Sequence, residues 1–125
     1  MNNIRLLQII PTLNSGGVDQ GVLDISEAII KSENISVVAS NGGRLVSKLQ
    51  KNGSTYIKIP VHSKNPFIIY NNINRIKKII SSYNINIMHT RSRAPAWSIY
   101  YAGINKINVA INIKKNHSLQ ILLRI

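Results

Sequence analysis

Short apolar runs of strand length alternate with segments of helical periodicity, and this alternation constrains the fold more than any other feature of the sequence. Residues 4–10 (IRLLQII) form a nearly continuous apolar run, as in a strand buried on both faces. Strands are also predicted at residues 35–39, 56–59 and 85–89, and helices at residues 18–31, 45–51, 66–83 and 95–101. Strands that alternate with helices build βαβ units. The sequence therefore predicts an α/β, Rossmann-like parallel sheet flanked by helices.

Two helix boundaries have clear signals. Gly53 stands where a helix over residues 45–51 would stop, and Asn65-Pro66 has the pattern of an N-cap followed by proline at the first helical position. The helix that follows carries a helical-period stripe made of Ile69, Ile73, Ile76, Ile80 and Tyr83.

We expect a Rossmann-like domain over residues 1–103 and a divergent tail over residues 104–125. Apolar and polar residues alternate over residues 107–113, which predicts a fifth strand with one polar face. The chain then passes through KKNHS and stops in the apolar segment LQILLRI. Such an ending suggests truncation, with the tail as an out-of-frame remnant.

The charge distribution favours an anionic partner. Sixteen Lys and Arg residues face four acids, for a net charge of +12, and the acids all lie within residues 19–33. A phosphorylated ligand, an anionic membrane and a nucleic acid all suit such a chain. Nucleic acid is disfavoured, because no recognition motif or row of stacking aromatics is present. The chain has no cysteine and no paired carboxylates, so we expect no metal and no cofactor.

The candidate ligand site lies at the carboxyl ends of the predicted strands, where open parallel sheets bind ligands. Glycine, histidine and basic residues gather there, and the four loops contain no acid, since Asp19 falls just inside the first helix. Backbone N–H groups and fixed positive charge suit a phosphate. The candidates are Gly16, Gly17, Asn41, Gly42, Gly43, His62, Lys64, His89, Arg91 and Arg93.

Each of these residues also has a structural interpretation. Gly16-Gly17 could be a plain turn, because it is neither a dinucleotide-binding fingerprint nor a P-loop. His89 could be a hydrogen-bonded scaffold residue, and Arg91 and Arg93 could be solvated. Their convergence on one edge carries the functional interpretation.

The helix over residues 66–83 offers a second candidate surface. Phe67, Ile68 and Tyr70 fall outside the isoleucine stripe, on a helix that also carries Arg75, Lys77 and Lys78. Exposed aromatic and aliphatic groups beside basic residues suit a membrane surface, whereas a core helix with a wet basic face is the alternative. No signal peptide and no apolar run of about 18 residues is present, so we expect a cytoplasmic protein, with peripheral membrane attachment as an option.

Three segments together resemble a known family. They are LLQIIPTLNSGGVDQGVLDISEAI, SNGGRLVSKLQKNG and INIMHTRSRAPAW, within residues 4–102. They are similar to the N-terminal half of retaining GT-B glycosyltransferases of the family-4 type, whose first strand ends in P-x-L-x-x-G-G-x-E-[RQ]. Enzymes that build bacterial lipopolysaccharide or capsule are the most similar. Asp19-Gln20 replaces the commoner Glu-Arg.

The resemblance implies an acceptor-side domain that works with a C-terminal donor domain. A nucleotide sugar would donate to a surface-polysaccharide or lipid-linked acceptor, without a metal ion. Gly16 and Gly17 would lie near the donor diphosphate. The acceptor side would comprise Asn41, Gly42, Gly43, Arg44, His89, Arg91 and Arg93.

The sequence also departs from the family pattern. The donor domain's paired-glutamate motif is missing, and His117 stands roughly where the family places a catalytic histidine, without the glycine that often follows it. We therefore expect an acceptor half that is inactive alone and needs a donor domain in trans. A non-catalytic basic module, either membrane-bound or part of a split transferase, and a decayed gene fragment are the alternatives.

Overall fold

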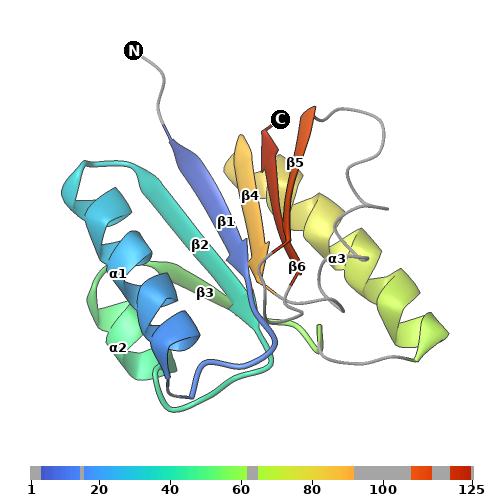
Figure 1. The fold of residues 1–125 in the computed structure, drawn as a ribbon, viewed down its shortest axis with the longest axis horizontal. Helices are drawn as coiled ribbons and strands as arrows, with labels where there is room; N and C mark the ends of the chain where they lie inside the picture. Colours follow the sequence, from blue (N-terminus) through green and yellow to red (C-terminus); the bar gives the residue numbers. More distant parts are fainter. Residues whose placement is uncertain (1–3, 15, 62–64, 92–107, 114–118, 125) are drawn as a thin grey trace.

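The computed structural model describes residues 4–14, 16–61, 65–91, 108–113 and 119–124. Its strands and helices alternate in the first three quarters of the chain, as predicted (Figure 1). In chain order they are β1 (Arg5–Ile9), α1 (Gly17–Lys31), β2 (Ile35–Ser40), α2 (Val46–Lys51), β3 (Thr55–Lys58), α3 (Pro66–Tyr83), β4 (Ile87–Arg91), β5 (Asn108–Ile113) and β6 (Leu119–Arg124).

The strands form one sheet in the order β3-β2-β1-β4-β6-β5. Strands β1 to β4 are mutually parallel, and the order 3-2-1-4 is that of a Rossmann-like half sheet. The α/β prediction is therefore confirmed for this part of the chain.

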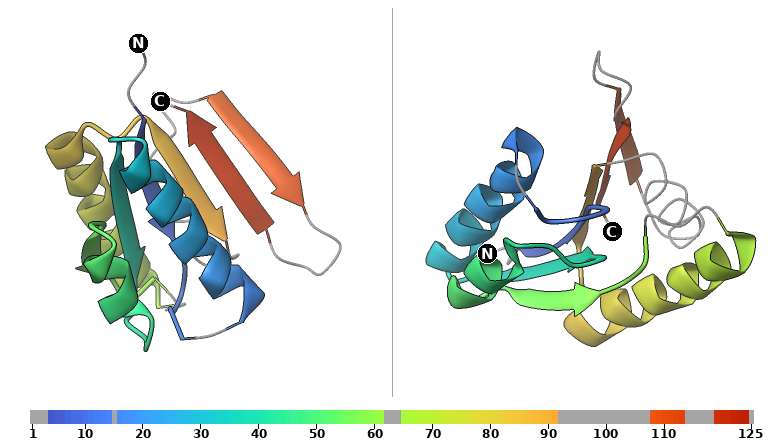
Figure 2. Two further views of the ribbon diagram at one scale, coloured as in Figure 1. Left: turned by 90° about the vertical axis from the view of Figure 1, so that its left-hand side faces the viewer. Right: turned by 90° about the horizontal axis from the view of Figure 1, so that it is seen from below.

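The last two strands depart from the parallel pattern. The predicted fifth strand is β5, but it lies at the sheet edge, and the apolar segment at the end of the chain supplies β6 between β4 and β5 (Figure 2). Strand β6 runs antiparallel to both neighbours. Only residues 114–118 connect β5 to β6, which is too short for the crossover that a parallel neighbour needs.

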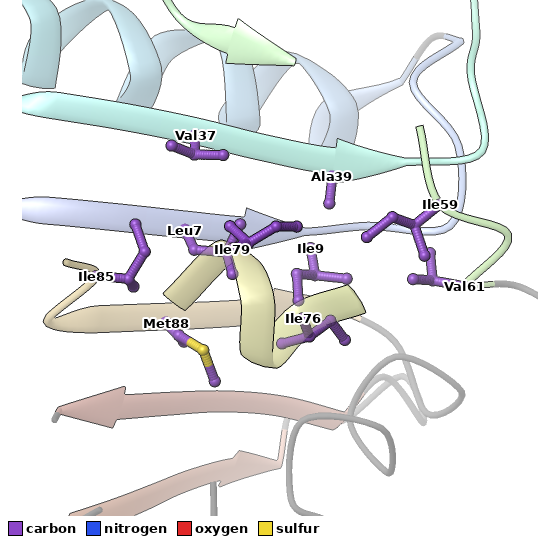
Figure 3. Packing of buried hydrophobic residues seen from close by; sticks show 10 residues of the cluster. All are labelled: Leu7, Ile9, Val37, Ala39, Ile59, Val61, Ile76, Ile79, Ile85 and Met88. Carbon is purple, nitrogen blue, oxygen red and sulfur yellow. The ribbon is translucent and has the colours of Figure 1, made fainter. Parts of the chain in front are cut away.

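Helices cover both faces of the parallel part of the sheet (Figures 1 and 2). Helices α1 and α2 lie on one face and α3 on the other. Alternate residues of each central strand face opposite layers, so Leu7 and Ile9 of β1 join the α3 side, where they cluster with Ile76 and Ile79 (Figure 3). On the other face, Val38 of β2 packs in a second cluster whose buried members are Ile10, Leu13, Val22, Leu23, Val38 and Leu49.

Helix α3 begins and ends where the sequence predicts. The Asn65 side chain accepts a hydrogen bond from the Phe67 N–H at 3.0 Å, which confirms the N-cap. The buried face is wider than the predicted stripe: Asn72 and Ile79 are buried with Ile76, and Ile80 and Tyr83 pack, partly buried, against the same cluster. The Asn72 side-chain nitrogen donates to the Pro60 carbonyl at 3.0 Å, which satisfies one of its two buried polar atoms.

Strand β4 begins two residues later than predicted. Asn84 takes a left-handed conformation (φ 51°) and ends α3, and Asn86 accepts a hydrogen bond from the Arg5 N–H. Ile85 belongs to this connection and is buried in the cluster on the α3 side. Because it is apolar and buried, the sequence pattern could not distinguish it from a residue of the strand.

Replacing the cap residue tests the start of α3. We expect Asn65→Ala to lower the free energy of unfolding by about 1 kcal/mol, because the Phe67 N–H loses its acceptor. Asn74→Ala, at an exposed position inside the same helix, should be neutral or stabilising by a few tenths of a kcal/mol, because alanine is the better helix former. Urea unfolding of both variants checks this, and equal destabilisation by the two would contradict the cap.

Candidate functional site

Backbone hydrogen bonds join the loops that follow β1 and β2. The Asn41 N–H donates to the Pro11 carbonyl, the Leu13 N–H to the Gly42 carbonyl, and the Leu45 N–H to the Leu13 carbonyl, each at 2.9 Å. These contacts continue the β1–β2 pairing beyond the ends of the strands. The loop containing Gly16 and the loop containing Asn41–Arg44, predicted to share one edge, are therefore held together.

Gly43 allows the two loops to approach so closely, and we call this hydrogen-bonded pair of loops the joint. The φ of Gly43 is 140°, and a Cβ atom there would lie 2.1 Å from the Leu13 carbonyl oxygen, so only glycine fits. Gly42 also has a positive φ of 96°, but the nearest atom to a Cβ there would be Cε of Lys58, at 4.0 Å. Gly43 thus has a packing role, whereas the space beside Gly42 is open apart from a basic side chain.

Asn14 links the two loops to the start of α1. Its N–H donates to Oδ2 of Asp19 at 2.9 Å, and its side-chain oxygen accepts from the Arg44 N–H at 3.2 Å. Asp19 lies in the first turn of α1, as predicted, and its carboxylate contacts the backbone of the first loop. A carboxylate in the first turn is favoured by the helix dipole, and here it also satisfies a loop N–H.

The first turn of α1 presents bare backbone. Gly16 is the N-cap with φ 100° and has no capping side chain, and Gly17 is the first helical residue. Both are exposed, and a Cβ atom at either would meet nothing within 4 Å. A ligand could therefore approach the backbone closely here, and helix N-termini attract anions.

His89 lies inside β4 and not at its end. It is paired in register with Gln8 of β1, partly buried, and two residues before Arg91, the last residue of the strand. Gln8 is buried, and its side-chain amide donates to Ser26 Oγ at 3.0 Å and to the Val22 carbonyl at 3.3 Å. His89 therefore lies in register beside a buried polar residue of β1. The candidates outside the described residues are His62, Lys64, Arg93 and His117.

Sequence reasoning missed the contact that supports the second loop. Ser40 Oγ and the Tyr56 hydroxyl lie 2.9 Å apart, and the Tyr56 hydroxyl donates to the Ser40 carbonyl at 3.0 Å. The Gly42 N–H in turn approaches Ser40 Oγ at 3.3 Å. A serine before Asn-Gly-Gly indicates a turn, but no local pattern predicts that this serine contacts a tyrosine sixteen residues later.

The described part of the chain contains neither a metal-binding cluster nor a membrane-spanning helix. No group of three His, Asp or Glu side chains gathers there in a way that could hold a metal ion. None of the helices described is both long and apolar enough to cross a bilayer.

The two loop glycines allow a matched test of the joint. We expect Gly43→Ala to lower the free energy of unfolding by about 3 kcal/mol or more, because it combines backbone strain with a clash against Leu13. Gly42→Ala should cost about 1 kcal/mol, from backbone strain alone. Chemical unfolding measures both, and similar losses would show that the approach to Leu13 is unimportant.

Comparison with known proteins gives one informative match. No family model matches the chain, and no curated protein matches it significantly. The solved structure of a glycosyltransferase from Rickettsia africae ESF-5 superposes with a TM-score of 0.75 at 42% sequence identity. The match covers 83% of this chain and 27% of the Rickettsia chain, so this chain spans about a quarter of its neighbour's length. In sequence and in fold, the chain is similar to part of a glycosyltransferase.

Proposed function

We propose that the chain forms the acceptor-side domain of a retaining GT-B glycosyltransferase of the family-4 type. It would help to transfer a sugar from a nucleotide-sugar donor to a surface-polysaccharide or lipid-linked acceptor, in lipopolysaccharide or capsule synthesis. The observation that carries the proposal is the 42% identity to a glycosyltransferase over 83% of the chain. Identity at that level goes well beyond a shared Rossmann-like topology, which many unrelated functions use.

The geometry of the joined loops supports the division of roles. The bare backbone at Gly16 and Gly17 admits close approach of the donor diphosphate, and N–H groups of the first turn would face it. The neighbouring Asp19 carboxylate opposes a phosphate, but one of its oxygens already accepts from Asn14. Exposed Arg44 and Lys58 would supply positive charge near the second loop.

The acceptor would lie along the same edge. We assign it to the loop Asn41–Arg44 and to the end of β4, with His89, Arg91 and Arg93 as the candidate contacts. His89 lies two residues before the end of β4, so of these candidates it would be the furthest from the loop. We assign no catalytic role to His117, and we expect no metal ion in the reaction.

Catalysis would need a donor domain, supplied in trans or as part of a longer polypeptide. The Rickettsia glycosyltransferase is almost four times as long as the segment that matches this chain, so most of that enzyme lies outside the match. We place the transferase in the cytoplasm, where nucleotide sugars are made.

A chimera tests the proposal directly. This chain would replace the matching segment of the Rickettsia glycosyltransferase, and the release of nucleoside diphosphate from a panel of nucleotide sugars would be measured. We expect the chimera to turn over the same nucleotide sugar as the parent, and this chain alone to turn over none. A folded chimera without turnover, beside an active parent, would contradict the proposal.

A single substitution in the chimera tests the diphosphate loop. We expect Gly17→Ala to leave the unfolding midpoint unchanged, because a Cβ atom there meets nothing within 4 Å. The rate of sugar transfer should fall by about tenfold or more, because the methyl group keeps the diphosphate away from the backbone. Unchanged kinetics with unchanged stability would show that the donor does not approach Gly17.

A further inference from the structure

Helix α3 exposes two large aromatic side chains at its N-terminal end. Phe67 is 82% exposed and Tyr70 is 67% exposed. Ile35, the first residue of β2, is the other large hydrophobic residue that is exposed in the described part of the chain, at 43%. Two exposed aromatic side chains three residues apart form a local apolar patch, and soluble proteins seldom expose contiguous apolar surface.

Basic residues continue the same face of the helix. The buried side of α3 carries Asn72, Ile76 and Ile79. At 3.6 residues per turn, Lys77 lies two turns beyond Tyr70 in the same row, and Lys78 lies three turns beyond Phe67. Both lysines are exposed. The outer face of α3 is thus apolar and aromatic at one end and basic at the other.

The charge on this side of the molecule is unbalanced. Helix α3 contains no acid, and the sequence has none after Glu33. The exposed acids Asp24 and Glu27 lie on α1, which covers the opposite face of the sheet (Figure 1). Glu27 there pairs with Lys31 at 2.9 Å. The outer face of α3 therefore carries positive charge with no acid beside it on the helix, whereas on the opposite face the lysines of α2 accompany the acids of α1.

We propose that the outer face of α3 is a docking surface for an anionic lipid bilayer. A helix that lies in the headgroup layer buries its aromatic side chains at the acyl boundary and directs its lysines to lipid phosphates. Each lysine near an anionic surface raises the affinity about fivefold. A bilayer can contact the aromatic end and the basic end of this face at the same time, over the length of an 18-residue helix. This contact requires no sugar, donor or acceptor, so its test is independent of the transferase proposal.

Vesicle co-sedimentation of the purified chain tests the surface. We expect binding to vesicles of equal parts phosphatidylcholine and phosphatidylglycerol, much weaker binding to phosphatidylcholine alone, and release at high salt. The double variant K77Q/K78Q should lower the partition coefficient about twenty-five-fold. The matched control K48Q/K51Q removes the same charge from α2, on the opposite face, and should lower it less than about threefold.

The aromatic end is tested by F67S/Y70S. This variant should reduce binding at least about tenfold, with an unchanged circular dichroism spectrum because both side chains are exposed. Phe67→Trp in a Trp97→Phe background leaves one tryptophan as a reporter, since Trp97 is the single tryptophan of the chain. Its emission should shift to the blue on anionic vesicles, and brominated lipids should quench it.

Three results would overturn the proposal. Equal binding to neutral and anionic vesicles would show that charge does not drive the contact. An equal loss of affinity in K77Q/K78Q and K48Q/K51Q would show that α3 is not the contact surface. A native chain that binds no vesicles, but self-associates in a way that F67S/Y70S abolishes, would assign the face to a second copy of the chain.

Discussion

The close approach of the Leu13 and Gly43 backbones holds the candidate site together. The two loops exchange hydrogen bonds through Leu13, which donates to Gly42 and accepts from Leu45, and a side chain at position 43 would separate them. Leu13 is itself fully buried in the cluster beneath α1 and α2, so the joint is anchored in the core. The starts of α1 and α2 are therefore positioned relative to each other before any ligand binds. A site built on such preorganised backbone pays little conformational entropy on binding.

Periodicity and turn residues were enough to predict the parallel half of the fold. Helix α3 was predicted at its observed bounds because its start has a cap-proline signal and its length exceeds four turns. The order of β5 and β6 could not be predicted in this way, because pairing across the sheet depends on connections and not on local pattern. No local pattern distinguished Asn34, Asn84 and Asn86, which lie at turns that hold the start of β1 or end α3.

The sequence was enough to predict at which edge of the sheet the candidate site lies, but not which role each residue has there. Parallel strands must end on a common side, so collecting the residues after each strand brought together two loops that the structure joins. The same reasoning could not distinguish Gly43, which is required by Leu13, from Gly17, whose surroundings are open. Nor could it predict the hydrogen bond from Asn14 to Asp19 or the contact of Tyr56 with Ser40. These contacts arise only when the helix and the neighbouring strand are in position.

The two proposed surfaces share one end of the molecule. Helix α3 follows the carboxyl end of β3, so its first turns, which contain Phe67 and Tyr70, belong to the same end of the sheet as the loops after β1 and β2. A bilayer held against these aromatics would stand beside the acceptor side of the site and away from the acidic face of α1. With both proposals combined, a lipid-linked acceptor would reach the joined loops by lateral diffusion, without leaving the membrane. A free polysaccharide acceptor would gain nothing from that arrangement, so vesicle binding by α3 would favour the lipid-linked class.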